Sequence, residues 1–266
     1  MLEYKNLELG GCYHQAPMSY PALLSWCEKK AEQFAPYITD TGNYIAAALS
    51  NHQKVVLEAQ LGAMRDIDYG IFPYTSSSST ISAYGPIGAG IPGTLPDHIV
   101  GVLKAYSTCV GAGPFTAEKA MPEKWMESLR KSGGEYGAAT GRPRRVGPFD
   151  AVASAYGLKC QNADKIALTK LDVLSHMDEI PVITSYKLND EIITEFDPLD
   201  DLDSMTPVIQ MLPGWNTDIS KCRKYEELPE NARKYIETLE HLLNHEIQFI
   251  SVGAERNQYL TKGEWL

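Results

Sequence analysis

The sequence predicts an α/β protein in which helices flank a largely parallel sheet. Patterns typical of helices and of strands alternate along the 266 residues, and this alternation is typical of folds built on a parallel sheet. The clearest example is residues 228–245, which carry apolar residues on one helical face and lead into the strand-like sequence IQFISVG. No internal repeat and no linker with a shift in composition interrupts the chain. We therefore expect residues 1–266 to form a single domain, or one piece of a larger one.

The first third of the chain is expected to contain two helices, one strand and a long loop. Residues 21–38 place apolar side chains at helical spacing, and Asp40 can cap a second helix through 43–49. We expect both helices to pack through their apolar faces. The short apolar run at 54–57 predicts a buried strand, and the glycine- and serine-rich residues 62–93 predict a loop. A loop of this length is usually functional or disordered, and its small residues suit backbone that passes close to a ligand.

Strand and helix patterns also alternate in the rest of the chain. The segments PVITSYKL and EIITEF predict a hairpin, because Asn189 and Asp190 between them tolerate the positive φ angles of a tight turn. The other expected elements are strands at 100–108, 165–169 and 247–253, helices at 122–131, 150–156 and 228–245, and a basic loop at 137–147.

Net charge and cysteine spacing limit the class of protein. A formal net charge of −10 argues against a nucleic-acid or anionic-membrane partner, because phosphate groups would be repelled unless a local basic patch dominated. The five cysteines are widely spaced and include no C-x-x-C pair, which indicates reduced thiols and a cytoplasmic location. No stretch approaches a membrane span, and the first residues have neither a signal-peptide nor a transit-peptide profile and read like the middle of a protein.

The motif TKLD follows the predicted strand 165–169, so it would lie at the carboxyl end of a strand, where open α/β sheets bind ligands. The carboxylate of Asp172 could accept hydrogen bonds from both N1–H and the exocyclic amine of guanine, whereas adenine has no matching donors. The stem of Lys170 could cover the face of the base. The motif resembles the guanine-reading N/T-K-x-D element of GTP-binding proteins. Taken in isolation, four residues are more typical of a solvated lysine and an aspartate that caps the next segment.

Three arginines lie within four positions between flexible glycines, in an otherwise acidic protein. Arg142, Arg144 and Arg145 concentrate guanidinium groups that match the geometry of carboxylates and phosphates. The alternative is a solvated basic loop or a salt-bridge hub. The flanking glycines and Thr140 favour an anion-binding loop.

Two further patterns are less specific. RDIDYG runs into TSSSST at 75–80, whose hydroxyl and backbone N–H groups could cradle a phosphate or could belong to a flexible loop. His241 and His245 lie one helical turn apart and could share a metal, but H-E-x-x-H is absent and we favour a solvated helix face. The sequence contains no complete glycine-rich phosphate loop and no nucleophile elbow.

Seven sequence blocks, taken together and in order, resemble the signature blocks of adenylosuccinate synthetases. The resemblance extends from about Pro36 to about Gln258, and it implies a P-loop-NTPase-like fold that is incomplete relative to the family. The blocks are DIDYGIFPYTSSSST, KAYSTCVGAGPF, GEYGAATGRPRRVGPFDAVA, ALTKLDVLSHMDEIPV, LPGW, YEELPENARKYIE and ISVG.

The resemblance implies a ligase of purine (AMP) biosynthesis that joins IMP and L-aspartate to give adenylosuccinate. GTP, with Mg²⁺, would phosphorylate the 6-oxygen of IMP, and the amine of L-aspartate would then displace the phosphate. The first step turns a poor leaving group into a good one. The resemblance also implies a homodimer.

By position, the resemblance assigns binding roles to three groups of residues. For GTP the group is Arg144, Lys170, Leu171, Asp172, Ser251, Val252 and Gly253. The loop that closes on L-aspartate comprises Ala138, Ala139, Thr140, Gly141, Arg142, Pro143 and Arg144. For IMP the group is Gln60, Leu61, Ser76 and Arg142.

Several positions depart from the family pattern. The family's E-G-A-Q-G appears here as EAQLG, so the IMP-contacting glutamine is displaced by one position to Gln60 and Leu61 stands in its place. Ala139 replaces a threonine, and Pro143 replaces an arginine. These changes leave open an altered purine substrate in a divergent subgroup.

The family's amino-terminal G-D-E-G-K-G loop, whose Asp serves as general base and Mg²⁺ ligand, has no counterpart here, and neither has the His that acts as general acid. Positioned bases and cations supply most of the rate in such chemistry. We therefore expect no catalytic residue and no metal ligand in this chain, and expect turnover to need the missing part, on a separate amino-terminal chain or a longer reading frame. The alternatives are a catalytically inactive GTP- or nucleotide-binding fragment or regulatory module, and an unstable gene fragment.

Overall fold

The computed structural model describes residues 1–263 and residue 265. Contacts within the chain divide it into two compact units. The first is Met1–Val56 with Ala89–Ile91, and the second is Leu57–Gly88 with Pro92–Leu266. The expectation that residues 1–266 form a single domain stays a prediction.

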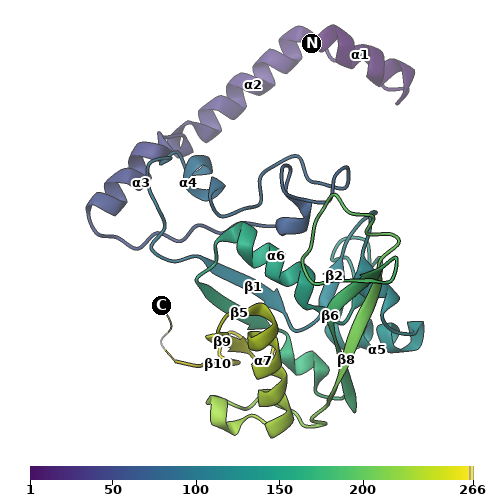
Figure 1. Cartoon of the computed structure of the whole chain (residues 1–266). Coiled ribbons are helices and arrows are strands. Elements are labelled where there is room, and N and C mark those ends of the chain that lie inside the picture. Colours follow the sequence, from purple (N-terminus) through teal and green to yellow (C-terminus); the bar gives the residue numbers. More distant parts are fainter. Residues whose placement is uncertain (264, 266) are drawn as a thin grey trace. The chain divides into compact units, whose positions relative to one another are not determined.

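The amino-terminal unit is helical. The side chain of Ser19 caps its second helix by accepting a hydrogen bond from the N–H of Ala22 at 3.3 Å, and the side chain of Asp40 caps the third by accepting from the N–H of Asn43 at 3.0 Å. Caps of this kind satisfy N–H groups that have no partner within the helix. The two expected helices and the Asp40 cap are confirmed. The elements are α1 (Leu2–Gly11), α2 (Tyr20–Phe34), the 3₁₀ turn η1 (Ala35–Tyr37) and α3 (Thr41–Ser50) (Figure 1).

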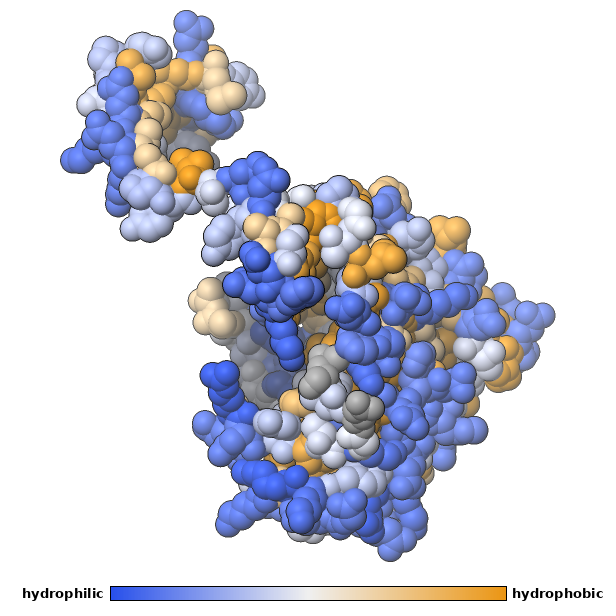
Figure 2. All heavy atoms as spheres, turned by 90° about the vertical axis from the view of Figure 1, so that its left-hand side faces the viewer, coloured by the Kyte–Doolittle hydropathy of each residue, from blue (hydrophilic) through white to orange (hydrophobic). Residues whose placement is uncertain are grey.

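The packing expected of these helices is not found among the described residues. The helices α1, α2 and α3 contain no buried residue. On the apolar face expected in α2, Leu24 is 42% exposed and Phe34 is 52% exposed. Figure 2 shows apolar side chains at the surface of this upper, helical part. Helical spacing thus predicted the helices and an apolar stripe but not what the stripe packs against.

The second unit contains a four-stranded sheet with the strand order β1-β5-β9-β10. β1 (Val100–Lys104), β5 (Lys165–Thr169) and β9 (Phe249–Ser251) run parallel, and β10 (Tyr259–Thr261) is antiparallel to β9. Since parallel strands end at the same edge of a sheet, the last residues of β1, β5 and β9 lie beside one another. The expected α/β class with a largely parallel sheet is confirmed.

A second sheet consists of β4 (Phe149–Asp150), β6 (Glu179–Leu188), β7 (Glu191–Ile193) and β8 (Thr206–Pro213). β4 is parallel to β6, whereas β7 and β8 are antiparallel to it. The expected hairpin is present between β6 and β7. Its turn residues Asn189 and Asp190 have φ angles of 48° and 69°, as a two-residue type I′ turn requires.

Helices cover these sheets and contribute to one main core. Its members include Leu129, Leu158, Ile166, Leu168, Tyr235, Ile236, Leu239 and Ile250. Within residues 1–263 and 265, no helix is long and apolar enough to cross a membrane. The helices are α4 (Tyr84–Gly88), α5 (Glu123–Gly133), α6 (Ala151–Gln161) and α7 (Glu230–Leu243), and the 3₁₀ turns are η2 (Ala63–Arg65), η3 (Thr116–Lys119), η4 (Leu171–Leu174) and η5 (Tyr225–Glu227).

Two expectations about strands are wrong. Residues 54–57 are irregular and exposed, and Val56 is 89% exposed. A short apolar run forms a buried strand only where a neighbouring strand pairs with it, and none of the described strands pairs with this run. Residues 100–108 form two strands instead of one. The chain leaves the sheet β1-β5-β9-β10 after β1, and β2 (Ser107–Cys109) then pairs with β3 (Arg145–Gly147) in a separate two-stranded sheet. The helix expected at 150–156 is present and extends further, to Gln161.

Candidate functional site

The TKLD motif lies at the carboxyl end of β5, as expected. Lys170 adopts the left-handed conformation with φ 61°, which turns the chain out of the strand and into η4. Leu171 is fully buried and Val173 nearly so. Because these neighbours are fixed in the core, the polar residues between them are held in a defined place at the edge of the sheet.

Asp172 lines a cavity of about 520 Å³. The cavity is also lined by Ser132 at the end of α5, by residues 173, 175 and 176, and by residues 216–218. Burial raises the pKa of the Asp172 carboxyl, and the charge of Asp218 across the cavity adds to this effect. None of the other described residues donates a hydrogen bond to this carboxylate. A ligand with two adjacent N–H donors would supply the hydrogen bonds that the carboxylate lacks.

Glu135 lies close to this motif and is completely buried. Its Oε1 accepts hydrogen bonds from the hydroxyl of Tyr106 at 2.7 Å, from Lys104 Nζ at 2.9 Å and from Lys170 Nζ at 3.2 Å. Its Oε2 accepts from Nη1 of Arg144 at 2.9 Å. We call Glu135 and these four partners the Glu135 cluster. One carboxylate thus holds three cationic side chains from different parts of the chain.

The electrostatics of the cluster follow from this arrangement. Burial by itself would raise the pKa of Glu135, but the hydrogen bonds from Tyr106 and Lys104 and the charges of Lys104 and Lys170 lower it to about 2. Burial lowers the pKa of Lys104, against the effect of Glu135. Three cations and one carboxylate leave a formal excess of two positive charges at the edge of the sheet. The cluster is therefore locally positive in a chain with a net charge of −10, and a positive cluster favours an anionic ligand.

Lys170 has a second anchor. Its Nζ donates to the carbonyl oxygen of Gly133 at 2.7 Å, at the carboxyl end of α5. A lysine ammonium at this end of a helix also interacts favourably with the exposed carbonyl groups. The lysine side chain is therefore held between the strand that precedes it and helix α5.

The loop that the resemblance assigns to L-aspartate, residues 138–144, lies within the expected anion-binding loop 137–147 and closes on its own backbone. The N–H of Gly137 donates to the carbonyl of Arg142 and the N–H of Gly141 donates to the carbonyl of Gly137, both at 2.8 Å. Gly141 has φ 64°, and the N–H of Arg142 donates to Thr140 Oγ1 at 3.3 Å. Residues 138–143 are exposed. Ala138, Ala139, Thr140 and Pro143 thus lie on a turn whose side chains can meet a ligand from solvent.

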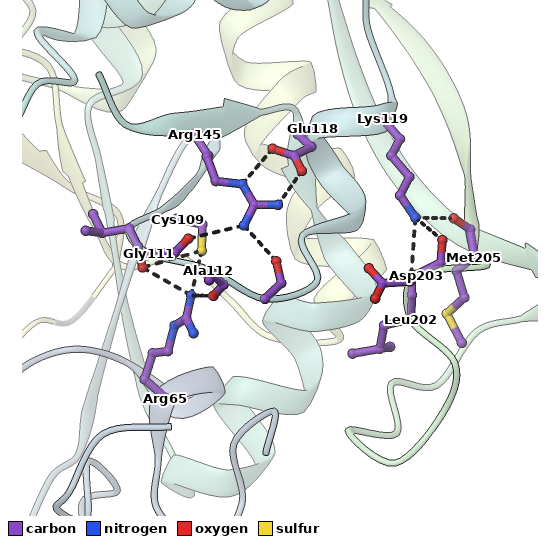
Figure 3. Close-up of polar contacts among 12 residues, drawn as sticks. Arg65, Cys109, Gly111, Ala112, Glu118, Lys119, Arg145, Leu202, Asp203 and Met205 are labelled. Carbon is purple, nitrogen blue, oxygen red and sulfur yellow. Dashed lines mark hydrogen bonds and ion pairs between the residues drawn. The ribbon is translucent and has the colours of Figure 1, made fainter. Parts of the chain in front are cut away.

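The three arginines of this region do not form one anion site. Arg142 is exposed on the loop, and Arg144 belongs to the Glu135 cluster. Arg145 is bound to Glu118 through both carboxylate oxygens, and its Nη1 donates to the carbonyl of Gly113 at 2.7 Å (Figure 3). The salt-bridge alternative is therefore correct for Arg145.

A second arginine holds the same segment from the other side. The Nη2 of Arg65 donates to Cys109 Sγ at 2.9 Å and to the carbonyl of Ala112 at 3.1 Å (Figure 3). Lys119 binds the carbonyl oxygens of three further residues, at distances from 2.5 to 3.4 Å, and so attaches η3 to the loop after β7; these residues are Leu202, Asp203 and Met205. The basic side chains shown in Figure 3 thus hold loops through contacts within the chain.

The serine-rich segment is ordered by a buried carboxylate. Asp66 is fully buried, and it accepts hydrogen bonds from the N–H of Thr80 at 2.6 Å and from Ser79 Oγ at 3.1 Å. The N–H of Ser76 donates to the carbonyl of Arg65 at 2.7 Å. Several donors that could have held a phosphate are thus engaged within the segment, and the choice between a phosphate-binding loop and a flexible loop stays open.

Ser251 ends β9, which pairs in parallel with β5, and Val252 and Gly253 follow the strand. Ser251 Oγ donates to the carbonyl of Gly253 at 3.0 Å, and Val252 is buried. A Cβ at Gly253 would meet the end of the Gln258 side chain, so that side chain packs closely against the turn. This turn lies beside the TKLD motif at the same edge of the sheet.

Gln60 and Leu61 lie apart from these groups in the hydrogen-bond network. Both are exposed in an irregular segment, and Leu61 has φ 70°. Among the described residues, no hydrogen bond joins either of them to Ser76 or Arg142. Nor do the described residues contain a group of three or more His, Cys, Asp or Glu side chains that could hold a metal ion.

Glu135, Lys104 and Tyr106 were not predicted from the sequence as site residues. Lys104 ends β1, but the sequence predicted one strand through 100–108, which places Lys104 in the middle of a strand and not at the ligand-binding edge. Glu135 stands between glycines in front of the arginine loop, but nothing in its spacing distinguishes a buried hub from a solvated glutamate.

Comparisons with known proteins agree with the resemblance of the seven blocks. Residues 1–260 match the sequence profile described as adenylosuccinate synthetase. The chain is 41% identical over 258 residues to the adenylosuccinate synthetase of Carboxydothermus hydrogenoformans and 37% identical to that of Caldanaerobacter subterraneus, covering 97% of this chain and 60% of each relative. A fully ligated adenylosuccinate synthetase from Plasmodium falciparum superposes with a TM-score of 0.86 at 34% identity, covering 97% of this chain and 62% of that one.

The chain thus spans about 60% of the length of the curated relatives it matches. The profile match over nearly the whole chain and the superposition with a TM-score of 0.86 agree with the order of the seven blocks. The chain therefore belongs to the adenylosuccinate synthetase family.

Proposed function

We propose that this chain recognises GTP and L-aspartate in an adenylosuccinate synthetase, and that it contributes to the GTP-dependent ligation of IMP and L-aspartate in AMP biosynthesis. Turnover needs the part of the family sequence that this chain does not match. In this proposal the general base, the general acid and the Mg²⁺ ligands lie in that other part. Mg²⁺ would neutralise charge at the transferring phosphoryl group.

The observation that carries the proposal is the position of Asp172. Its carboxylate faces a cavity, its pKa is raised by burial, and Lys170 beside it is held at two points. Guanine offers two adjacent donors to one carboxylate, and adenine offers none in that arrangement. This favours GTP over ATP as the phosphoryl donor.

The other binding roles follow the family positions. In the proposal, Arg144, Lys170, Leu171 and the turn 251–253 contact GTP, and the exposed loop 138–144 closes on L-aspartate. The excess positive charge of the Glu135 cluster supports an anionic ligand next to that loop. The IMP group comprises Gln60, Leu61, Ser76 and Arg142.

Calorimetry on the full chain with GTP and with ATP tests the base site. Two hydrogen bonds to a charged carboxylate are each worth about 1.5–3 kcal/mol, so GTP should bind at least about 100-fold more tightly than ATP. Asp172→Ala should remove this preference. Asp218→Asn, at a second carboxylate that lines the same cavity, is the matched control and should leave it. Equal affinity for the two nucleotides in the wild-type chain would sink the proposal of a guanine site.

A second experiment tests the ligase. The chain would be co-expressed with the amino-terminal part of a related synthetase, and GTP- and aspartate-dependent formation of adenylosuccinate would be measured. We expect synthesis only when both parts are present. The control is the same pair with Asp172→Ala, which should lose synthesis with GTP.

A GTP-binding module without ligase activity is the second candidate. It is favoured by one observation, which is that the cavity at Asp172 and the Glu135 cluster are both formed by this chain alone. Selective GTP binding together with no synthesis in the co-expressed pair would support the module over the ligase.

The family further suggests a homodimer in the cytoplasm, and we include both in the proposal. The net charge of −10 supports the absence of nucleic-acid and anionic-membrane partners. Sedimentation of the chain, alone and with the co-expressed part, would measure its oligomeric state.

A further inference from the structure

Glu135 joins two segments to which the proposed function gives different ligands. Through Oε2 it holds Arg144, the last residue of the loop assigned to L-aspartate. Through Oε1 it holds Lys170, the lysine of the motif assigned to guanine. The two carboxylate oxygens therefore face the two segments separately.

We propose that Glu135 is a positioning residue, which holds Arg144 and Lys170 in one fixed geometry and thereby couples the order of the 138–144 loop to that of the 170–174 motif. The identity of the ligands in this inference rests on the proposed function. The coupling of the two segments does not, because it follows from the contacts within the chain.

Arg144 depends on Glu135 for its position. Within the described part of the chain, the guanidinium group of Arg144 makes one hydrogen bond, from Nη1 to Glu135. The Nε of Arg144 is buried and has no partner among these residues. The backbone supports the same contact, because the N–H of Arg144 donates to the carbonyl of Glu135 at 2.9 Å. Loss of the carboxylate would leave the guanidinium without an anchor.

The cluster also keeps charge available for a ligand. A single carboxylate cannot neutralise Lys104, Arg144 and Lys170 together. The side chains of these three residues are 28%, 34% and 38% exposed, whereas that of Glu135 is 0% exposed. The carboxylate is thus enclosed, and the cations around it remain in reach of an anionic ligand. Glu135 orders them without cancelling their field.

Glu135→Gln is the perturbation that distinguishes positioning from packing, because it keeps the shape of the side chain. A glutamine amide has one oxygen that accepts and one nitrogen that donates. If its oxygen faces Lys104, Tyr106 and Lys170, its N–H₂ group faces the donor Nη1 of Arg144, and rotation of the amide moves the clash to the other side. Glutamine therefore cannot accept from both segments at once, so the bridge between them is broken, and segments that depend on that bridge should both lose order.

Glu118→Gln is the matched control. It weakens the other glutamate–arginine pair next to this loop, that of Glu118 with Arg145, and it touches neither Arg144 nor Lys170. Glu135→Asp keeps the charge on a shorter stem and serves as the conservative variant.

The first measurement is amide hydrogen exchange of the unliganded full chain, which needs no ligand. We expect Glu135→Gln to speed amide exchange about tenfold or more in both 138–144 and 170–174, because the loss of one charged hydrogen bond has about this effect. Glu118→Gln should speed exchange around 111–113 and leave 170–174 unchanged. Unchanged exchange in Glu135→Gln, or a change in one of the two segments only, would overturn the coupling.

The second measurement is calorimetry with GTP, whose affinity a merely packing role would not change selectively. Glu135→Gln should weaken GTP about tenfold or more, Glu135→Asp should recover part of that loss, and Glu118→Gln should bind within about twofold of wild type. If Glu118→Gln weakens GTP as much as Glu135→Gln does, the positioning role is refuted. If the wild-type chain does not bind GTP, the guanine site of the proposed function fails, and hydrogen exchange still decides the coupling.

Discussion

Asp150 is a buried carboxyl group that should make the fold less stable at neutral pH than at mildly acidic pH. It caps α6 by accepting from the N–H of Ala153 at 3.1 Å, and it accepts from the hydroxyl of Tyr186 at 2.7 Å. Both hydrogen bonds favour the charged form, but burial has the larger effect and raises the pKa to about 6. Neither partner is a cation, so the charge is not compensated.

The size of the effect follows from the difference between the folded and unfolded pKa values. The unfolded value is close to 3.8, so the difference is about 2 pKa units and corresponds to ~3 kcal/mol. Because the folded pKa is raised, the unfolded chain releases its proton first. Stability from this group is complete below about pH 4 and is lost as the pH rises to about 6.

Asp150→Asn removes the charge and keeps an oxygen that can cap the helix, while its amide N–H can donate to the hydroxyl oxygen of Tyr186. We expect it to raise the free energy of unfolding by about 2 kcal/mol at pH 7.5, because part of the gain is offset by the lost interaction with the helix dipole. At pH 4 the difference should be near zero. Urea denaturation of both proteins at several pH values measures it.

The comparison must be made between variants, because other carboxyl groups titrate in the same range. Glu135, whose pKa is lowered to about 2, contributes in the opposite direction. Its stabilisation is present above the pKa of the unfolded chain, and it is lost as the pH falls through the pKa of the folded protein. Tyr186→Phe is the control, and it should destabilise the protein further at pH 7.5 because it removes a donor to the charged form. A variant Asp150→Asn that is less stable than wild type at pH 7.5, or a difference that does not change with pH, would refute the reasoning.

Three further predictions concern single positions. Asp66→Asn should cost about 2–3 kcal/mol of unfolding free energy, because its amide would leave buried donors unpaired, and limited proteolysis should then cut within 75–80; an uncut loop would contradict this. Asp190→Gly should raise the free energy of unfolding by about 0.5–1 kcal/mol, because glycine adopts the φ of 69° without strain; a lower denaturation midpoint would count against it. Gly214→Ala should cost about 1–3 kcal/mol, because its Cβ would overlap the carbonyl oxygen of Met177, and an unchanged midpoint would contradict the prediction.

The fold was predictable where local chemistry decides it. The Asp40 cap and the turn at Asn189 and Asp190 depend on a few adjacent residues, and both were expected from the sequence. The buried strand expected at 54–57 was wrong because burial depends on what packs against a segment. For the same reason, the apolar face of α2 could be seen in the sequence although the described residues provide no cover for it.

The candidate site was predictable in part for the same reason. The place of Lys170 and Asp172 follows from a strand that ends in a polar motif, and the register of β5 with β1 and β9 confirms that edge. The roles of the arginines could not be separated, because Arg144 and Arg145 are adjacent in sequence and differ only in the glutamates that they meet, Glu135 and Glu118. These arginine–glutamate pairs join residues up to 27 positions apart, so a pattern of adjacent residues cannot predict them.

The Glu135 cluster has an asymmetry that explains how an acidic chain can maintain a basic site. Removing one of its cations leaves Glu135 with the remaining donors, because Oε1 alone accepts three hydrogen bonds. Removing the carboxylate leaves three partly buried cations that repel one another with no counter-ion. The cluster should therefore tolerate the loss of Lys104 better than the loss of Glu135. The negative residue is thus what makes the local concentration of positive charge possible, and a search for anion sites by counting basic residues alone would overlook it.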